Sequence, residues 1–247
     1  MICIRSDSMK FIVGRKLSMS QVYAEDRTIV PVTIVRVGAG VVTQIKTVDT
    51  DGYAAVQVGY NEGSKHVTAS VRGHVKGAVT RPYLKEFRVQ NADAFSVGQV
   101  YDASGFEPGD VVSVTGTSKG RGFSGVVKRH HFSGSPKTHG HKHDSRAPGS
   151  IGSTDSARVF PGMRMAGRFG AEQVTVKNLK IVSIDAENGT IAVKGALPGP
   201  RGSVVIISGD GEMKPVSDKE QKKEDLTSVE EVAKEDPITA ATEKVQS

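Results

Sequence analysis

Short runs of apolar residues, rich in Val, Ile and Thr, recur along the chain and are separated by turn residues. This pattern predicts strands at 29–37, 41–48, 54–60, 111–114, 174–176, 179–184, 190–194 and 204–207. Two of the connections carry strong turn signals, Asp51-Gly52 and Asn188-Gly189. Many short strands joined by such turns are typical of a β-sandwich or a small closed barrel, so we expect a mainly β protein.

Residues 61–98 interrupt this regular strand pattern. Within them, 67–76 favours one short helix and 84–89 favours one further strand, so we expect a small α+β insertion. The last segment, 208–247, contains no aromatic residue and is dominated by Glu, Asp and Lys. This composition is typical of a solvated, partly disordered tail.

The charge of the chain is unevenly distributed. Its net charge is +6, but residues 116–170 alone hold ten basic and two acidic side chains. The same segment holds five of the seven histidines and 11 of the 28 glycines, whereas 208–247 holds six basic and 11 acidic side chains. A long, almost one-signed basic segment favours a polyanionic partner.

The basic segment 116–170 does not have the composition of an independent domain. Burying its ten large apolar residues releases far less free energy than ordering 55 backbone units costs. Its glycines allow close approach of the backbone to phosphates, and its Lys and Arg side chains neutralise them. We therefore expect this segment to become ordered on a polyphosphate partner.

Several chemistries are disfavoured by the sequence. The stretch 116–122 is not a nucleotide-phosphate loop, because Lys119 precedes Gly120 instead of Ser or Thr. The single Cys3 excludes a disulfide framework and a multi-cysteine zinc site. No paired carboxylates lie in the basic segment, and no apolar run is long enough for a membrane helix. We therefore expect a cytoplasmic, non-enzymatic protein without a cofactor.

A cluster of histidines keeps one enzymatic alternative open. It consists of His130, His131, His139, His141 and His143. A barrel-based metalloenzyme would use them as metal ligands, but no Cys and only one carboxylate, Asp144, accompany them. Imidazoles also stack on bases and bond to phosphate or ribose. A regulatory RNA binder or RNA chaperone that acts outside any large assembly is a second alternative.

Seven blocks of sequence carry a resemblance to a known family. They are MKFIVGRKLSM (9–19), TGTSKGRGFSGVVKRH (115–130), THG (138–140), RAPGSIG (146–152), RVFPGMRMAGRFG (158–170), VTVKNL (174–179) and VKGALPGPRG (193–202). In this order they resemble large-subunit ribosomal protein three in its bacterial form. A single block is a weak signal, whereas the ordered set covers 9–207 and is highly specific.

The resemblance implies a six-stranded closed β-barrel of the translation-protein type, with a small inserted α+β subdomain and a long irregular extension. Such proteins bind 23S rRNA near its 3′ end and act early in assembly of the large subunit. Their extension reaches toward the peptidyl transferase centre, and their usual neighbours are ribosomal proteins fourteen and nineteen. We therefore expect a structural constituent of the large ribosomal subunit, with no membrane partner and no small-molecule substrate.

The resemblance divides the chain into seven segments. They are an alternative or non-native start (1–8), a first barrel segment (9–60), the α+β insertion (61–98), a second barrel segment (99–115), the basic extension (116–170), a third barrel segment (171–207) and the acidic tail (208–247). Three features depart from the family. Residues 1–8 precede its usual start at Met9, Ser18 replaces a common glycine, and Ser153 replaces a glutamine that some members methylate. We infer no modification at Ser153.

Twelve side chains of the extension are the expected rRNA contacts. They are Lys119, Arg121, Lys128, Arg129, His130, His139, Lys142, Arg146, Ser150, Arg158, Arg164 and Arg168. In this hypothesis the cations neutralise phosphates while the extension folds around RNA. The deepest portion of the extension is expected near 146–155, where Pro148-Gly149 turns the chain.

Overall fold

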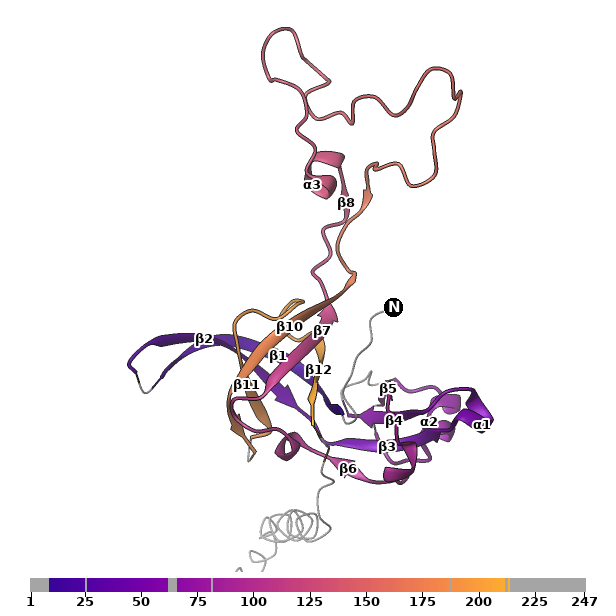
Figure 1. The fold of residues 1–247 in the computed structure, drawn as a ribbon, viewed down its shortest axis with the longest axis vertical. Helices are drawn as coiled ribbons and strands as arrows, with labels where there is room; N and C mark the ends of the chain where they lie inside the picture. The colour runs from indigo at the N-terminus through magenta and orange to yellow at the C-terminus, as the bar shows by residue number, and fades with distance from the viewer. Residues whose placement is uncertain are drawn as a thin grey trace, which may run out of the picture. The chain divides into compact units, whose positions relative to one another are not determined.

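The computed structural model describes residues 9–24, 26–61, 66–80, 82–186, 188–211 and 213. These residues form two compact units, one made of Phe11–Val37 and Glu107–Asp210 and the other built mainly from Gly38–Phe106 (Figure 1). Most of the regular structure is β-strand, which confirms the prediction of a mainly β protein. None of the helices in these residues is long and apolar enough to cross a membrane.

Six strands of the first unit form a hydrogen-bonded ring. They are β1 (Met9–Tyr23), β2 (Ile29–Val37), β7 (Val111–Thr117), β10 (Gln173–Asp185), β11 (Thr190–Lys194) and β12 (Val204–Asp210). Their order is β1-β12-β7-β10-β11-β2, and β2 pairs antiparallel with β1 to complete the ring. Each strand therefore has a neighbour on both sides along the paired region of the ring.

Buried and more exposed positions alternate along several strands of the ring, including β7 and β12. In β7, Val112 and Val114 are buried, whereas Val111, the first residue of the strand, is half exposed. Alternating side chains point to opposite faces of a strand, so one face enters the core. Paired strands share this face: Ile207 is the register partner of Val114 and is fully buried as well.

A second sheet forms the other unit, with the strand order β5-β4-β3-β6. Its strands are β3 (Gly40–Lys46), β4 (Ala55–Tyr60), β5 (Tyr83–Arg88) and β6 (Val100–Tyr101). Its helical elements are α1 (Val48–Asp51), α2 (Ala69–Val75), η1 (Ala92–Ala94) and η2 (Ala103–Gly105). Every residue of the central strand β4 is buried.

Sheet membership corrects the predicted segment boundaries. The expected first barrel segment, 9–60, is too long, because β3 and β4 pair with each other and belong to the second sheet. The expected second barrel segment, 99–115, contains β6, which also joins that sheet. The insertion predicted at 61–98 therefore spans Gly38–Phe106. A local run of Val, Ile and Thr identifies a strand, but it does not say which sheet the strand joins.

Several local predictions are confirmed. Helix α2 lies within the predicted helix at 67–76, β5 matches the strand at 84–89, and β3 and β4 form the hairpin marked by Asp51-Gly52. The connection between β3 and β4 contains one turn of helix, α1. Gly52 ends this helix in the left-handed conformation, with φ of 79°. The predicted strands 174–176 and 179–184 are one strand, β10, with a register shift between Val176 and Leu179.

The ends of the ring strands shift two further boundaries. β7 continues to Thr117, so the basic extension begins at Ser118, two residues later than predicted. β12 continues to Asp210, so the first residues assigned to the acidic tail belong to the ring. The rest of that tail from 214, and the segment 1–8, lie outside the described residues.

The extension between β7 and β10 contains three short elements, β8 (Phe123–Ser124), α3 (Val126–His130) and β9 (Gly167–Arg168). Residues 131–166 contain no helix and no strand. This agrees with the predicted irregular extension.

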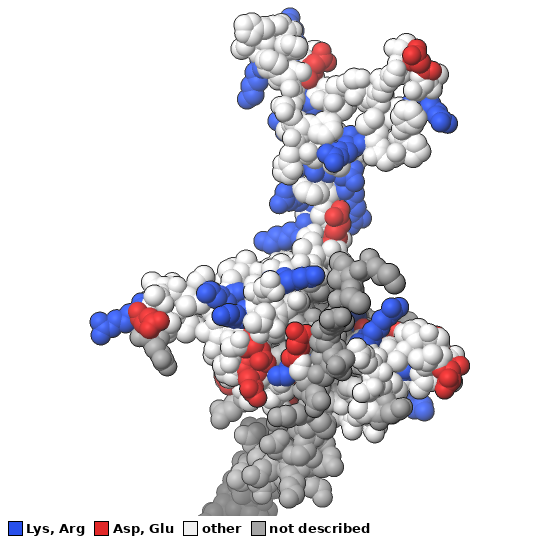
Figure 2. All heavy atoms as spheres, viewed as in Figure 1, with Lys and Arg blue, Asp and Glu red and all other residues white. Residues whose placement is uncertain are grey.

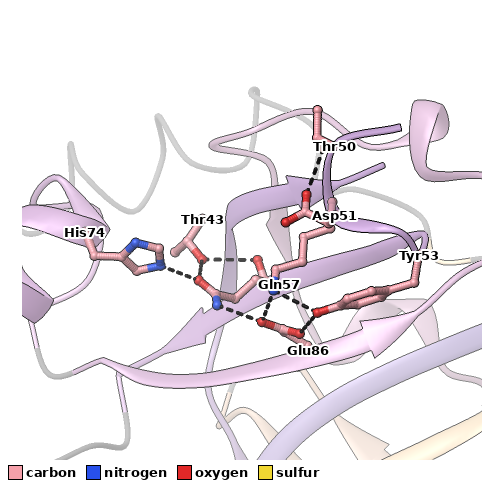
Figure 3. A network of polar contacts seen from close by, with 8 residues as sticks. Thr43, Thr50, Asp51, Tyr53, Gln57, His74 and Glu86 are labelled. Carbon is pink, nitrogen blue, oxygen red and sulfur yellow. Dashed lines mark hydrogen bonds and ion pairs between the residues drawn. The ribbon is translucent and has the colours of Figure 1, made fainter. Parts of the chain in front are cut away.

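Polar side chains on the second sheet form a hydrogen-bonded network around Glu86 (Figure 3). Lys46 Nζ lies 3.0 Å from Glu86 Oε1 and donates a hydrogen bond of 2.8 Å to the Tyr53 hydroxyl. That hydroxyl donates to Glu86 Oε2 at 3.0 Å, and Gln57 Nε2 donates to Glu86 Oε1 at 3.3 Å. The hydrogen bond from Lys46, followed by that from Tyr53, lowers the pKa of Glu86 from its ordinary value of 4.5.

This network predicts a pH-dependent contribution to stability. A carboxyl group whose pKa is lowered by folding stabilises the protein above its unfolded pKa, and the contribution is lost as the pH falls through the folded pKa. We expect Glu86→Gln to lower the melting temperature by a few degrees at neutral pH and to have no effect at strongly acidic pH. Thermal unfolding followed by circular dichroism tests this. Asp49→Asn, at an exposed carboxylate of α1, is the control. An equal loss at both pH values contradicts the prediction.

Candidate nucleic-acid interface

The two arms of the extension pair with each other as a stalk, here residues 118–124 and 167–172. The Ser118 amide donates a hydrogen bond of 2.9 Å to the Glu172 carbonyl, and the Glu172 amide is 3.3 Å from Ser118 Oγ. Further along, β8 pairs antiparallel with β9. The stalk therefore prolongs the pairing of β7 with β10 beyond the ring (Figure 1).

The stalk carries exposed cations on both of its arms. Lys119, Arg121 and Arg168 are exposed. Arg121 and Phe169 make two contacts. The Arg121 amide donates a hydrogen bond of 2.9 Å to the Phe169 carbonyl, and the Arg121 guanidinium lies 4.9 Å from the Phe169 ring centroid. A guanidinium stacked on an aromatic ring keeps its N–H groups in a fixed orientation, with donors left for phosphates.

Helix α3 places three further basic side chains near the top of the stalk, Lys128, Arg129 and His130. Arg129 Nη1 donates a hydrogen bond of 3.0 Å to the Met165 carbonyl, and His130 Nε2 lies 3.1 Å from the same oxygen. These contacts attach α3 to the returning arm. Arg129 and His130 are partly exposed, while Lys128 is exposed and makes no such contact with the described residues.

The loop 131–166 has very few internal contacts. One backbone hydrogen bond, from the Ser135 amide to the Ser145 carbonyl (3.0 Å), joins distant positions within it. Of the described residues 118–170, Ser124 and Val126 are the two that are buried. Phe123 is 82% exposed. Large apolar side chains of the loop are also exposed, namely Ile151, Val159, Phe160, Met163 and Met165. The extension has no hydrophobic core of its own.

Positive charge dominates the surface of the extension (Figure 2). Among the described residues, the two carboxylates of the segment, Asp144 and Asp155, form no ion pair with its ten cations. Side chains that are exposed and not neutralised within the protein are available to bind phosphates at little cost. The electrostatic character of the segment therefore matches the prediction from its composition.

The structure places the predicted contact residues on the surface of this extension. Ten of the twelve are exposed, and the other two, Arg129 and His130, are partly exposed. They are distributed along the stalk and the loop instead of converging on one pocket. Ser150 donates a hydrogen bond to the Gly152 carbonyl (3.2 Å).

The histidine cluster does not form a metal-binding set among the described residues. There, no group of three His, Cys, Asp or Glu side chains is close enough to hold a metal ion. His139 is exposed on the loop, whereas His130 contacts the Met165 carbonyl and its ring centroid lies 6.0 Å from that of Phe132. The metalloenzyme alternative thus gains no geometric support from these residues.

Two basic residues outside the predicted set belong to this surface. Lys137 is exposed on the loop. Lys16, on β1, is 8% exposed and donates hydrogen bonds to the carbonyls of Leu197 (2.8 Å) and Gly199 (3.1 Å). Burial, followed by repulsion from Lys119, lowers the pKa of Lys16.

A hollow of about 460 Å³ lies at the base of the stalk beside Lys16. Lys119, Arg121 and Phe169 of the stalk line it together with Lys16 and Leu197 of the ring. It brings three basic side chains together at the point where the extension leaves the ring. The sequence alone does not reveal this position of Lys16, because its hydrogen-bond partners lie more than 180 residues away along the chain.

Comparison with known proteins finds relatives in one protein family. The family model described as ribosomal protein L3 matches residues 84–195. A protein of Fervidobacterium nodosum named large ribosomal subunit protein uL3 is 49% identical over 203 residues, which cover 81% of this chain and 97% of that protein. Proteins of the same name from Dehalococcoides mccartyi strain BAV1 and Herpetosiphon aurantiacus are 46% and 47% identical. Those alignments cover 81% and 80% of this chain and 98% and 94% of the relatives.

These matches span both units of the fold and the extension between β7 and β10, and they extend over nearly the whole length of the relatives. They confirm the family resemblance carried by the seven sequence blocks. The chain belongs to the ribosomal protein L3 family.

Proposed function

We propose that this chain is a structural constituent of the large ribosomal subunit in the bacterial cytoplasm and that its extension binds 23S rRNA directly. One observation carries the proposal: residues 116–170 expose ten cations beside two carboxylates and bury almost no apolar surface. The printed name of the relatives, large ribosomal subunit protein, supports the cellular assignment. No step of this function requires catalysis, so the chain acts by binding.

In the proposed mechanism the six-stranded ring is a closed barrel that holds the base of the stalk. The stalk and loop enter the RNA, and their cations replace counterions around phosphates. Exposed apolar side chains such as Phe160 and Met163 then gain packing partners among the bases. Ordering of the loop is thereby coupled to binding, as expected for a segment without a core.

The family resemblance supports a more specific placement. We propose that the binding site lies near the 3′ end of 23S rRNA, that binding occurs early in subunit assembly, and that the loop reaches toward the peptidyl transferase centre. Ribosomal proteins fourteen and nineteen are the proposed neighbours.

Binding of the chain to a 23S rRNA fragment from the 3′ region should depend steeply on salt. If about five of the ten cations meet phosphates, log K should fall with log salt concentration with a slope of about −4. Fluorescence anisotropy at several salt concentrations measures this slope. An association that is insensitive to salt contradicts the proposal.

A high-salt wash of ribosomes separates this function from that of an RNA chaperone. A stoichiometric subunit protein stays on large subunits through the wash, and one copy per subunit is expected. A chaperone is removed, and its recovery in the wash would favour that alternative.

A further inference from the structure

A second surface of the first unit, distinct from the extension, is the outer end of the β1–β2 hairpin, here called the ribbon (described residues 18–24 and 26–31). The other strands of the ring pair with the hairpin only along its inner half. β12 begins at Val204, and Ser203 just before it accepts a hydrogen bond from the Lys16 amide. On the other side, the pairing of β11 with β2 ends at Val32. Beyond these points the described residues of β1 and β2 pair with no other strand, and one further backbone hydrogen bond reaches them, from the Gly195 amide to the Pro31 carbonyl.

The hydrogen-bond register shows which backbone groups of the ribbon face outward. The Ala24 amide donates to the Thr28 carbonyl at 3.0 Å, so this pair is a hydrogen-bonded one. Bonded and non-bonded pairs alternate along an antiparallel ladder. Met19, Gln21 and Tyr23 therefore turn their N–H and C=O groups away from β2. Among the described residues, no strand pairs with this edge.

Pro31 agrees with this register. It is the partner of Gln21, at a position whose amide would face outward, so its missing N–H costs no ladder hydrogen bond. Its carbonyl accepts a hydrogen bond from the Gly195 amide at 2.9 Å, on the outer side of β2.

One face of the ribbon is apolar and exposed. Met19 is 55% exposed, Tyr23 is 66% exposed, and Ile29, the register partner of Tyr23, is 57% exposed. Alternate residues of a strand share a face, and directly paired residues of neighbouring strands share a face as well. Met19, Tyr23 and Ile29 therefore lie on the same face of the ribbon. An open strand edge beside exposed apolar side chains is the arrangement that recruits an additional β-strand.

The charge of the ribbon indicates the class of the partner. Between 17 and 33 the single basic residue is Arg27, against the acidic Glu25 and Asp26. An RNA partner requires several cations to neutralise phosphates, and the extension meets that requirement whereas the ribbon does not. A slightly acidic, apolar edge instead complements a polypeptide that carries Lys or Arg beside apolar residues.

We propose that the ribbon is a protein-docking surface: an extended segment of another, basic protein of the large subunit adds as a β-strand to the Met19–Tyr23 edge of β1 and packs on Tyr23 and Ile29. This inference rests on the proposed function, because the partner is a component of the same subunit. It concerns a surface that does not participate in binding RNA.

Site-specific photo-crosslinking in intact large subunits tests the inference. One full-length variant carries benzoylphenylalanine at Gln21, on the open edge, and a second carries it at Lys142, on the loop. After irradiation, the Gln21 position is expected to yield an adduct that resists ribonuclease and contains a Lys- or Arg-bearing peptide of another protein. The Lys142 position is expected to yield an adduct with rRNA.

A second pair of variants tests the apolar face. With the crosslinker at Gln21, the changes Tyr23→Ser and Ile29→Ser should lower the adduct yield about tenfold, because they remove the central anchors of the contact. Both side chains are exposed, so the fold should be retained. Arg27→Gln, at an exposed residue of the same turn, is the matched control and should not lower the yield.

The inference is judged when the Lys142 position crosslinks to RNA. In that case, three results at the Gln21 position overturn it: an adduct with RNA, an adduct with a second copy of this chain, or no adduct. Absence of an RNA adduct at Lys142 overturns the proposed function instead.

Discussion

Replacing Lys128, Lys142 and Arg146 with Ala is expected to weaken binding of the chain to 23S rRNA about 100-fold at physiological salt. All three side chains are exposed on the extension and form no ion pair with the described residues. Each phosphate contact releases counterions and contributes about fivefold to affinity at this salt concentration. Fluorescence anisotropy with a labelled 23S fragment measures the loss.

A matched variant tests whether RNA binding depends on the position of the removed cations or only on the amount of charge removed. Replacing Arg72, Lys76 and Lys194 with Ala removes the same charge from exposed sites outside the extension. Its affinity should change less than about fivefold. Equal losses in the two triple variants would show that binding depends on net charge and not on the extension.

Gly170→Ala is expected to open the stalk. Gly170 has φ of +74°, and an added Cβ would meet the Lys119 carbonyl oxygen and lie 3.1 Å from Gly120 Cα. Both atoms belong to the backbone of the facing arm, so no side chain can move aside. A strained backbone costs about 1–3 kcal/mol, so exchange of the Arg121 and Phe169 amides should accelerate about 10- to 100-fold.

Gly149→Ala is the control for this change. Gly149 has φ of +80° but no atom within 4 Å of its added Cβ, so it isolates the cost of the left-handed conformation from that of the collision. Hydrogen exchange followed by mass spectrometry reports on both variants. Faster stalk exchange in Gly149→Ala than in Gly170→Ala would contradict the role of close contact between the arms.

The strands were predictable because their signal is local. Short runs rich in Val, Ile and Thr identified β2, β7, β11 and β12 without knowledge of their partners. Membership in the ring or the second sheet was not predictable, because it depends on pairing between distant segments. β1 shows a further limit, since its sequence, MKFIVGRKLSMSQVY, contains no long run of Val, Ile and Thr and was not among the predicted strands.

The charged character of the site was likewise predictable, whereas its internal contacts were not. Net charge and glycine content marked residues 116–170 before any geometry was known. The bonds of Arg129 and His130 to Met165 join residues more than 30 positions apart. Lys16 reaches the base of the stalk from the start of the chain. Such contacts arise from the tertiary arrangement and leave no local pattern in the sequence.

Hydrogen exchange of residues 131–166, measured in the free chain and in intact large subunits, tests most directly whether the loop is completed by RNA. The amides of this loop should exchange rapidly in the free chain and become strongly protected in the subunit, while the core strands of the ring are protected in both states. Strong protection of the loop in the free chain, or none in the subunit, would contradict an extension that becomes ordered by binding rRNA.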